Sequence, residues 1–221
     1  MMSTILNEIE VRVLGSLIEK QVTTPEYYPL TLNSLTIACN QKNNRFPVTA
    51  FDEAAVAQAL ETLREKNLVY VVYGSTSRVP KYKHVATDVL HLSQAELAAM
   101  CVLMLRGAQT TGEVAGRGYR LYEFSGLEEV ESTMNSLISR EPEPLVVRLP
   151  RQPGQKEVRF AHLLSGEVNV EQVVESQHVQ KTGSSRGGVE RMEKLEQEVE
   201  ALRADVTTLQ QQFLEFKKQF E

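Results

Sequence analysis

The chain has 221 residues, of which 42% are hydrophobic and 24% are charged, and this length suffices for one large core or two small ones. Its formal net charge of −5 argues against a protein that coats nucleic acid with its whole surface, because non-specific affinity for DNA grows with the number of phosphates neutralised. Any contact with DNA would therefore come from local basic patches.

The first residues lack the basic and apolar segments of a secretory signal, and the longest apolar run, Leu97 to Leu105, is too short to span a bilayer. Cys39 and Cys101 lie in separate apolar segments, each without a cysteine nearby, which is typical of reduced thiols in the core of a cytosolic protein. We expect a cytoplasmic protein with no membrane partner.

Apolar residues recur at helical spacing in three segments of the first half, residues 8–20, 31–40 and 49–67. Asn7 is a favourable cap for the first of these helices, and Thr49, with Asp52 three residues later, predicts the start of the third. Residues 68–73 and 79–84 are rich in β-branched and aromatic side chains and flank the turn sequence GSTS, so they predict a hairpin.

The second half repeats this order. A glutamate follows three residues after each of three predicted helix caps, Ser93, Thr110 and Ser125. Residues 145–150 and 158–164 then predict a second hairpin. The chain thus contains two copies of the order three helices and a hairpin. This order predicts a mainly helical α+β protein with tandem winged helix-turn-helix domains, residues 1–86 and 87–165.

The segment LNEIEVRVLGSLIEKQVTTPEYYPLTLNSLTIACNQKNNRFPV, residues 6–48, resembles the opening of the YceH family of bacterial proteins of unknown function. The similarity continues through the second half. This resemblance implies two winged-helix domains in one chain, and it implies no reaction, ligand or partner.

Residues 166–188 are rich in Gly, Ser, Gln and Glu and predict a flexible linker. In residues 189–221, apolar side chains alternate at spacings of three and four, as in the heptads of a coiled coil: Met192, Leu195, Val199, Leu202, Val206, Leu209, Phe213, Phe216 and Phe220. Their distribution favours two parallel strands, so we expect a homodimer through this segment. The alternative is that the helix packs back on its own domains.

The sequence shows no constellation typical of catalysis or metal binding. Its four histidines are scattered, and none has a second ligand at the spacing of a zinc site. The chain contains no G-x-S-x-G elbow, no phosphate-binding G-x-x-x-x-G-K-[ST] loop and no dinucleotide fingerprint after a strand. We expect a protein that is not an enzyme and that uses no cofactor or metal.

In helix-turn-helix complexes the third helix enters the major groove, while loops and wings hold phosphates. Each predicted third helix has a net charge of −2, whereas the hairpin segments 74–84 and 148–159 each carry +3. We therefore predict that double-stranded DNA is held mainly by the hairpins and by the loop before the first of these helices. The residues expected to contact DNA are Lys42, Asn43, Asn44, Arg45, Thr49, Gln58, Arg78, Lys81, Lys83, Arg148, Arg151, Lys156 and Arg159.

Two functions are compatible with this architecture. The favoured one is a DNA-associated protein resembling a transcription regulator. The alternative is a protein–protein docking module, because the architecture resembles in outline the segregation and condensation protein ScpB. The hairpin cations could also protect a sheet edge from pairing. A single merged core, or hairpin cations buried where the two halves meet, would remove the basis for any nucleic-acid role.

Overall fold

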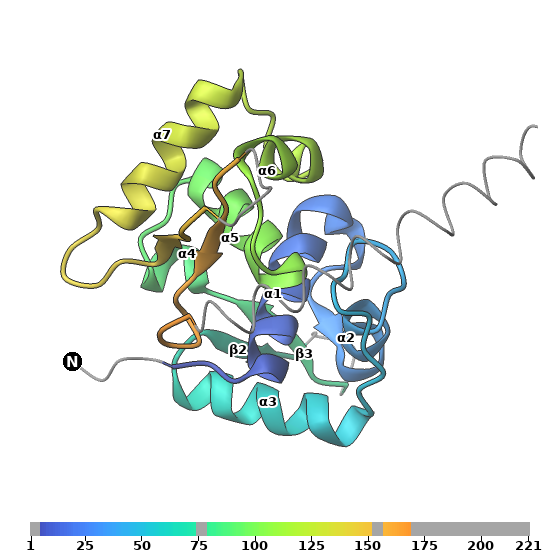
Figure 1. Ribbon diagram of the computed structural model, residues 1–221. Coiled ribbons are helices and arrows are strands. Elements are labelled where there is room, and N and C mark those ends of the chain that lie inside the picture. Colours follow the sequence, from blue (N-terminus) through green and yellow to red (C-terminus); the bar gives the residue numbers. More distant parts are fainter. Residues whose placement is uncertain (1–4, 74–78, 152–156, 169–221) are drawn as a thin grey trace, which may run out of the picture. The chain divides into compact units, whose positions relative to one another are not determined.

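The structure, a computed structural model, describes residues 5–73, 79–151 and 157–168 (Figure 1). The predicted coiled coil, and the predicted linker from residue 169 on, lie outside the described residues. The described part is an α+β arrangement, with the elements in this order: α1 (Glu8–Thr23), a short 3-10 helix (Pro25–Tyr27), β1 (Leu30–Thr31), α2 (Leu32–Cys39), α3 (Glu53–Glu65), β2 (Val69–Val72), β3 (Lys81–His84), α4 (Ala86–Val89), α5 (Gln94–Arg106), α6 (Thr111–Gly118), α7 (Leu127–Ile138), β4 (Val146–Arg148) and β5 (Phe160–His162).

Side-chain caps begin several helices at the predicted residues. Asn7, Ser93 and Thr110 each accept a hydrogen bond from the backbone N–H of the glutamate three residues later. The carboxylate of that glutamate accepts the N–H of the cap in return, which satisfies two backbone donors at each helix start. Thr31 caps α2 through the N–H of Ser34, at 3.3 Å. These four starts are confirmed.

The third helix of each half begins later than the sequence predicts. The helix α3 starts at Glu53, after Asp52 as the cap, and α7 starts at Leu127. Thr49 and Ser125 were the predicted caps, but their side chains are engaged elsewhere. The hydroxyl of Ser125 donates to the Glu129 carboxylate at 2.9 Å, and Thr49 belongs to a buried network described below.

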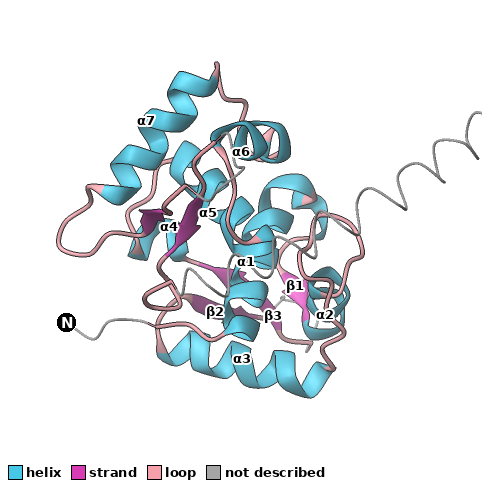
Figure 2. Cartoon of the chain, in the orientation of Figure 1, coloured by secondary structure: helices cyan, strands magenta, loops and turns pink. Residues whose placement is uncertain are grey.

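Two small antiparallel sheets accompany the helices (Figure 2). The first has the strand order β1-β3-β2, with Leu30 opposite Tyr82 and Tyr70 opposite Lys83. The second contains β4 and β5, and an isolated bridge joins Gln109 to Phe160 of β5. Since Gln109 directly precedes the cap of α6, just as β1 ends at the cap of α2, this bridge occupies the place of β1 in the second half.

The buried side chains of both halves form one continuous apolar core instead of two separate ones. Its centre is the crossing of α1, from the first half, and α5, from the second (Figure 1). Gly15 permits this approach, because a Cβ at that position would lie 3.0 Å from Cδ2 of Leu105 and 3.2 Å from Cβ of Met104. The helix α1 is consequently covered on nearly every side.

Both cysteines are free and buried, as the sequence predicts. The Cys101 thiol donates to the carbonyl oxygen of Gly15 at 3.4 Å, and burial raises its pKa well above the ordinary value, so it stays protonated at the α1–α5 crossing. None of the helices within the described ranges has both the length and the apolar composition that a membrane span requires.

Candidate nucleic-acid interface

The outward face of the β2–β3 hairpin combines basic and aromatic side chains. Alternation along β3 turns Tyr82 and His84 into the core and Lys81 and Lys83 away from it. Lys83 lies opposite Tyr70, whose side chain is also exposed. Neither lysine has an ion-pair partner among the residues that the structure describes, so both ammonium groups are free to meet an anionic ligand.

His84 fastens this hairpin to the core. Its backbone N–H donates to the hydroxyl of Tyr28 at 2.8 Å, and its Nε2 lies 2.5 Å from Oε1 of Gln21 on α1. Since an amide oxygen only accepts, Nε2 carries the hydrogen and Nδ1 is left without a partner. Burial lowers the pKa of His84 to about 4, and the side chain is neutral at physiological pH.

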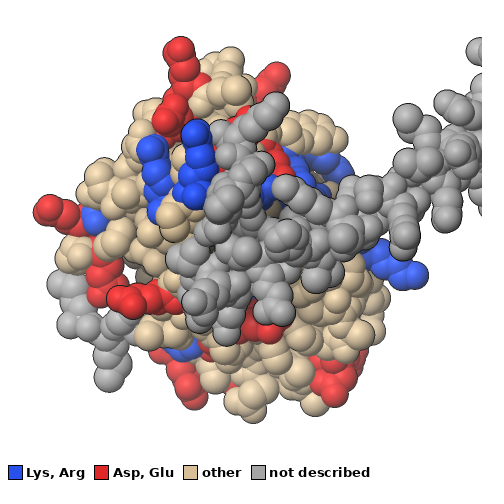
Figure 3. Space-filling view, in the orientation of Figure 1, with Lys and Arg blue, Asp and Glu red and all other residues tan. Residues whose placement is uncertain are grey.

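The third helices present acidic surfaces. On α3, Gln58 is exposed as predicted, but Glu61 and Glu65 are exposed beside it. Arg64 forms an ion pair with Glu61 at 2.7 Å and partly offsets that charge. In Figure 3 acidic side chains lie at the lower margin, where α3 lies, and again at the upper and left margins, with Lys and Arg side chains among them near α7.

The β4–β5 hairpin contributes two exposed arginines, Arg148 and Arg151. The guanidinium of Arg148 lies 5.5 Å from the ring centroid of Phe160 and 3.6 Å from the Glu131 carboxylate, so its position is partly fixed. Arg159 is different, because it donates to the Glu113 carboxylate at 2.7 Å and to the Ala108 carbonyl at 2.8 Å. With its charge neutralised there, Arg159 is removed from the DNA-facing set.

The loop before α3 divides into an exposed and a buried part. Lys42 and Asn43 are exposed, as expected of a phosphate-binding loop. Asn44 is also exposed, but it accepts a hydrogen bond from Arg106 at the end of α5, and Phe46 N–H donates to the Leu105 carbonyl at 2.9 Å. These contacts tie the loop to the second half of the chain.

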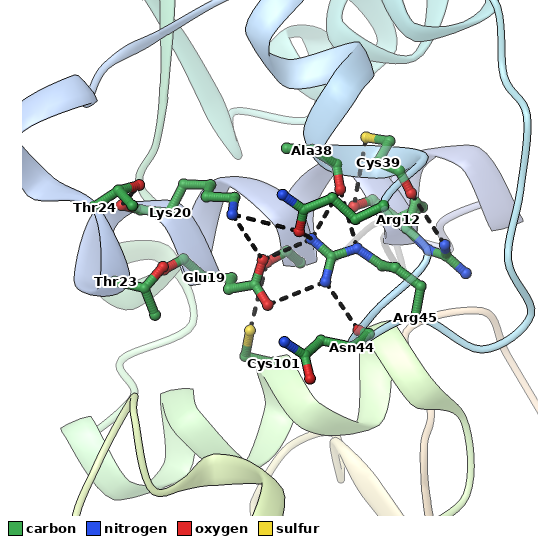
Figure 4. Close-up of polar contacts among 12 residues, drawn as sticks. Arg12, Glu19, Lys20, Thr23, Thr24, Ala38, Cys39, Asn44, Arg45 and Cys101 are labelled. Atoms are coloured by element: carbon green, nitrogen blue, oxygen red, sulfur yellow. Dashed lines mark hydrogen bonds and ion pairs between the residues drawn. The ribbon is translucent and has the colours of Figure 1, made fainter. Parts of the chain in front are cut away.

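Arg45 corrects the sequence-based prediction most clearly, since its side chain has 0% exposure. Its guanidinium points at the Glu19 carboxylate and donates two hydrogen bonds to it, at 3.0 and 2.6 Å (Figure 4). It also donates to the carbonyl oxygens of Ala38 and Asn44. Because every donor direction is used inside the protein, Arg45 stabilises the fold and cannot reach a phosphate.

Thr49 belongs to a neighbouring buried network rather than to a DNA-facing helix. Its hydroxyl accepts a hydrogen bond from Arg12 of α1 at 3.3 Å and lies 3.3 Å from the side-chain oxygen of Asn40. Arg12 donates further to the Pro47 carbonyl at 2.8 Å. Two guanidinium groups, those of Arg12 and Arg45, thus lie in this interior near Glu19. Burial and the nearby Arg45 lower the pKa of Arg12.

Sequence reasoning missed the buried charges of α1. Periodicity identified the apolar side of this helix but left Arg12 and Glu19 on its polar side. That side is covered by the loop 41–47 and by α5, which the sequence pattern does not reveal. Arg45 and Glu19 are 26 residues apart in the chain, so the sequence pattern alone does not show that they form an ion pair.

Two predicted contacts, Arg78 and Lys156, lie outside the described residues, as does the predicted dimerisation segment. Within the residues that are described, no three His, Cys, Asp or Glu side chains cluster closely enough to hold a metal ion.

Comparison with known proteins identifies the family. Residues 6–155 match a family described as "Protein of unknown function, DUF480". The UPF0502 protein of Geobacter sulfurreducens is 49% identical over 223 residues, covering 100% of each chain. That of Opitutus terrae is 48% identical over 199 residues, covering 90% of this chain and 84% of its own, and that of Vibrio atlanticus is 46% identical, covering 94% and 96%. The chain therefore belongs to the DUF480 (UPF0502) family of bacterial proteins, in agreement with its resemblance to YceH.

Proposed function

We propose that this protein is a tandem winged-helix protein that associates with double-stranded DNA and holds phosphates through its hairpins. The strand order β1-β3-β2, with β1 between the first two helices, supports a winged-helix arrangement in the first half. In the second half the Gln109–Phe160 bridge takes the place of the short strand and supports the same arrangement.

The observation that carries the proposal is the outward face of β2 and β3. Lys81 and Lys83 lie there beside the exposed ring of Tyr70, and no described carboxylate pairs with either lysine. Unpaired cations release condensed counterions when they meet phosphates, which is the main source of sequence-independent affinity for DNA. On the second hairpin Arg151 is exposed, whereas the exposed Arg148 already lies 3.6 Å from the Glu131 carboxylate, so this hairpin contributes less to the proposed binding.

The acidic third helices set the character of this binding. Glu61 and Glu65 on α3 would repel phosphates beside the major groove, and Gln58 is the remaining exposed side chain suited to an adenine edge. We therefore expect weak discrimination between sequences. One continuous core replaces the two separate cores expected from the sequence, and this removes the argument for a nucleic-acid role that rested on two compact units. The proposal rests instead on the hairpin cations alone, which lie outside that core.

The test is binding of the full chain to labelled duplexes of unrelated sequence across a salt series. The proposal predicts similar affinities for all duplexes and a steep fall of the binding constant with salt, equivalent to several released counterions. A dimer through the predicted coiled coil, residues 189–221, would steepen the fall by bringing additional hairpins to one duplex. Absence of binding at low salt would contradict the proposal.

A protein-docking module is the second candidate, and the outer surface of α7 favours it. Glu128 and Glu131 are exposed there, and Leu127 at the start of the helix is 57% exposed. An apolar side chain rimmed by carboxylates suits a basic partner protein better than a nucleic acid. This function predicts no DNA binding at low salt, together with loss of partner capture in Leu127→Ser.

A further inference from the structure

A cavity of about 170 Å³ lies where α6 and the end of α5 face the end of α1 and the loop before α3. Three arginines line it: Arg106 from α5, Arg117 from α6 and Arg120 just after α6. Glu19 and Asn44 contribute from the first half, and Tyr119, a residue that is 66% exposed, also lines the cavity. The cavity is separate from both hairpin faces.

The acidic groups around this cavity are already neutralised. Glu19 is held by Arg45 at 2.6 Å and lies 3.7 Å from Lys20 (Figure 4). The second carboxylate, Glu113, lies 2.7 Å from Arg159 and 3.4 Å from Arg117. Each carboxylate therefore has two cationic partners, and none is left over for the remaining guanidinium groups.

Arg106 and Arg120 are the cations in excess. Arg106 donates to the amide oxygen of Asn44, which carries no charge, and Arg120 has no hydrogen-bond or ion-pair partner among the described residues. Burial lowers the pKa of Arg106, and the nearby Arg117 and Arg45 lower it further by repulsion. Glu19 and Glu113 offset part of this repulsion, and a bound anion would offset it further.

We propose that this cavity binds the phosphate group of a small molecule. A tetrahedral dianion has enough oxygens to accept from several guanidinium groups at once, and the planar fork of arginine matches that geometry. The volume suits a phosphate ion or a small phosphomonoester better than a drug-sized ligand, whose pockets reach roughly 300–1,000 Å³. Tyr119 offers its ring to the substituent that the phosphate carries.

The test is calorimetric titration of the full chain with inorganic phosphate and with glycerol 3-phosphate, at constant ionic strength adjusted with chloride. Arg106→Gln and Arg120→Gln should each weaken binding about tenfold, because each removes a charge-assisted donor. Gly116→Glu should block the site without removing an arginine, since Gly116 lines the cavity and a Cβ there meets no atom within 4 Å. Arg64→Gln, which removes an arginine elsewhere, should bind as wild type.

Three results would overturn the proposal. They are the absence of saturable binding to either phosphate compound, an equal loss in Arg64→Gln, and a loss of DNA affinity in Arg120→Gln as large as its loss of phosphate affinity. The last would assign the site to the phosphates of DNA instead of a small molecule. Arg120 is exposed, so its variant should fold, and circular dichroism checks this. Since Lys81 and Lys83 are not part of the cavity, failure of DNA binding leaves this test unaffected.

Discussion

Arg45, in the loop before α3, and Lys83, on β3, carry the same charge in opposite surroundings. The Arg45 side chain has 0% exposure and gives two hydrogen bonds to Glu19, whereas Lys83 is exposed and has no carboxylate partner among the described residues. A buried cation with a fixed partner stabilises the fold, and an exposed cation without one is available to a ligand. Exposure and partners, rather than charge, thus decide which basic residues can act in binding.

Removing Arg45 should have the largest effect on stability. Arg45→Met leaves Glu19 buried without its bidentate partner, and breaking such a pair costs about 3–5 kcal/mol. The matched control is Lys42→Gln in the same loop, where an exposed side chain should matter by less than about 0.5 kcal/mol. Urea unfolding measures both, and equal losses would contradict the distinction between the two parts of the loop.

The attachment of the β2–β3 hairpin should depend on pH. Burial lowers the pKa of His84 and of His162 to about 4, and their ordinary value is 6.5. Below pH 6.5 the unfolded chain binds protons that the folded chain does not, so stability falls with decreasing pH, by about 2 kcal/mol per histidine between pH 6.5 and pH 5. In His84→Leu this slope should decrease by about half; an unchanged slope would show that His84 is not buried in neutral form.

The crossing of α1 and α5 provides a smaller effect. Gly15→Ala places a Cβ 3.0 Å from Leu105, and overpacking of this kind costs about 1–3 kcal/mol. Gly116→Ala is the control, because nothing lies within 4 Å of its Cβ and alanine favours the helix by about 1 kcal/mol. In thermal unfolding, Gly15→Ala should lower the midpoint temperature and Gly116→Ala should not. A neutral Gly15→Ala would mean that the halves pack less closely than their shared core implies.

Local features of this fold were predictable from the sequence, and long-range ones were not. Asn7 and Ser93 cap their helices through contacts three residues away, so their roles follow from nearby residues alone. The outward direction of Lys83 follows equally from strand alternation. Arg45 was predicted to contact DNA because its loop is basic and polar, but its burial depends on Glu19 and on α5, which lie far away in the chain.

In the two sheets, too, only some of the strands could be predicted from the sequence. The hairpin strands were predicted from runs of β-branched residues, but β1 has only two residues and the bridge at Gln109 only one, too short for any periodic pattern. The third helices start late because Ser125 and Thr49 bind other groups. Repetition of order along the chain was therefore easier to recognise than the single core that joins the halves.

The hairpin lysines should affect stability least and DNA binding most. Lys83 is exposed and Lys81 half-buried, and neither forms an ion pair with a described residue, so Lys81→Gln and Lys83→Gln should each change the free energy of unfolding by less than about 0.5 kcal/mol. Arg120→Gln removes one cation outside the hairpins and is the matched control.

The salt dependence of duplex binding in these three variants tests the central claim most directly. Each lysine variant should reduce the log–log salt slope by about one, because one phosphate contact is lost, while Arg120→Gln should keep the slope of the wild-type protein. If the two lysine variants keep the wild-type slope, or if Arg120→Gln reduces it by as much as they do, the outward face of the β2–β3 hairpin is not where this protein holds DNA.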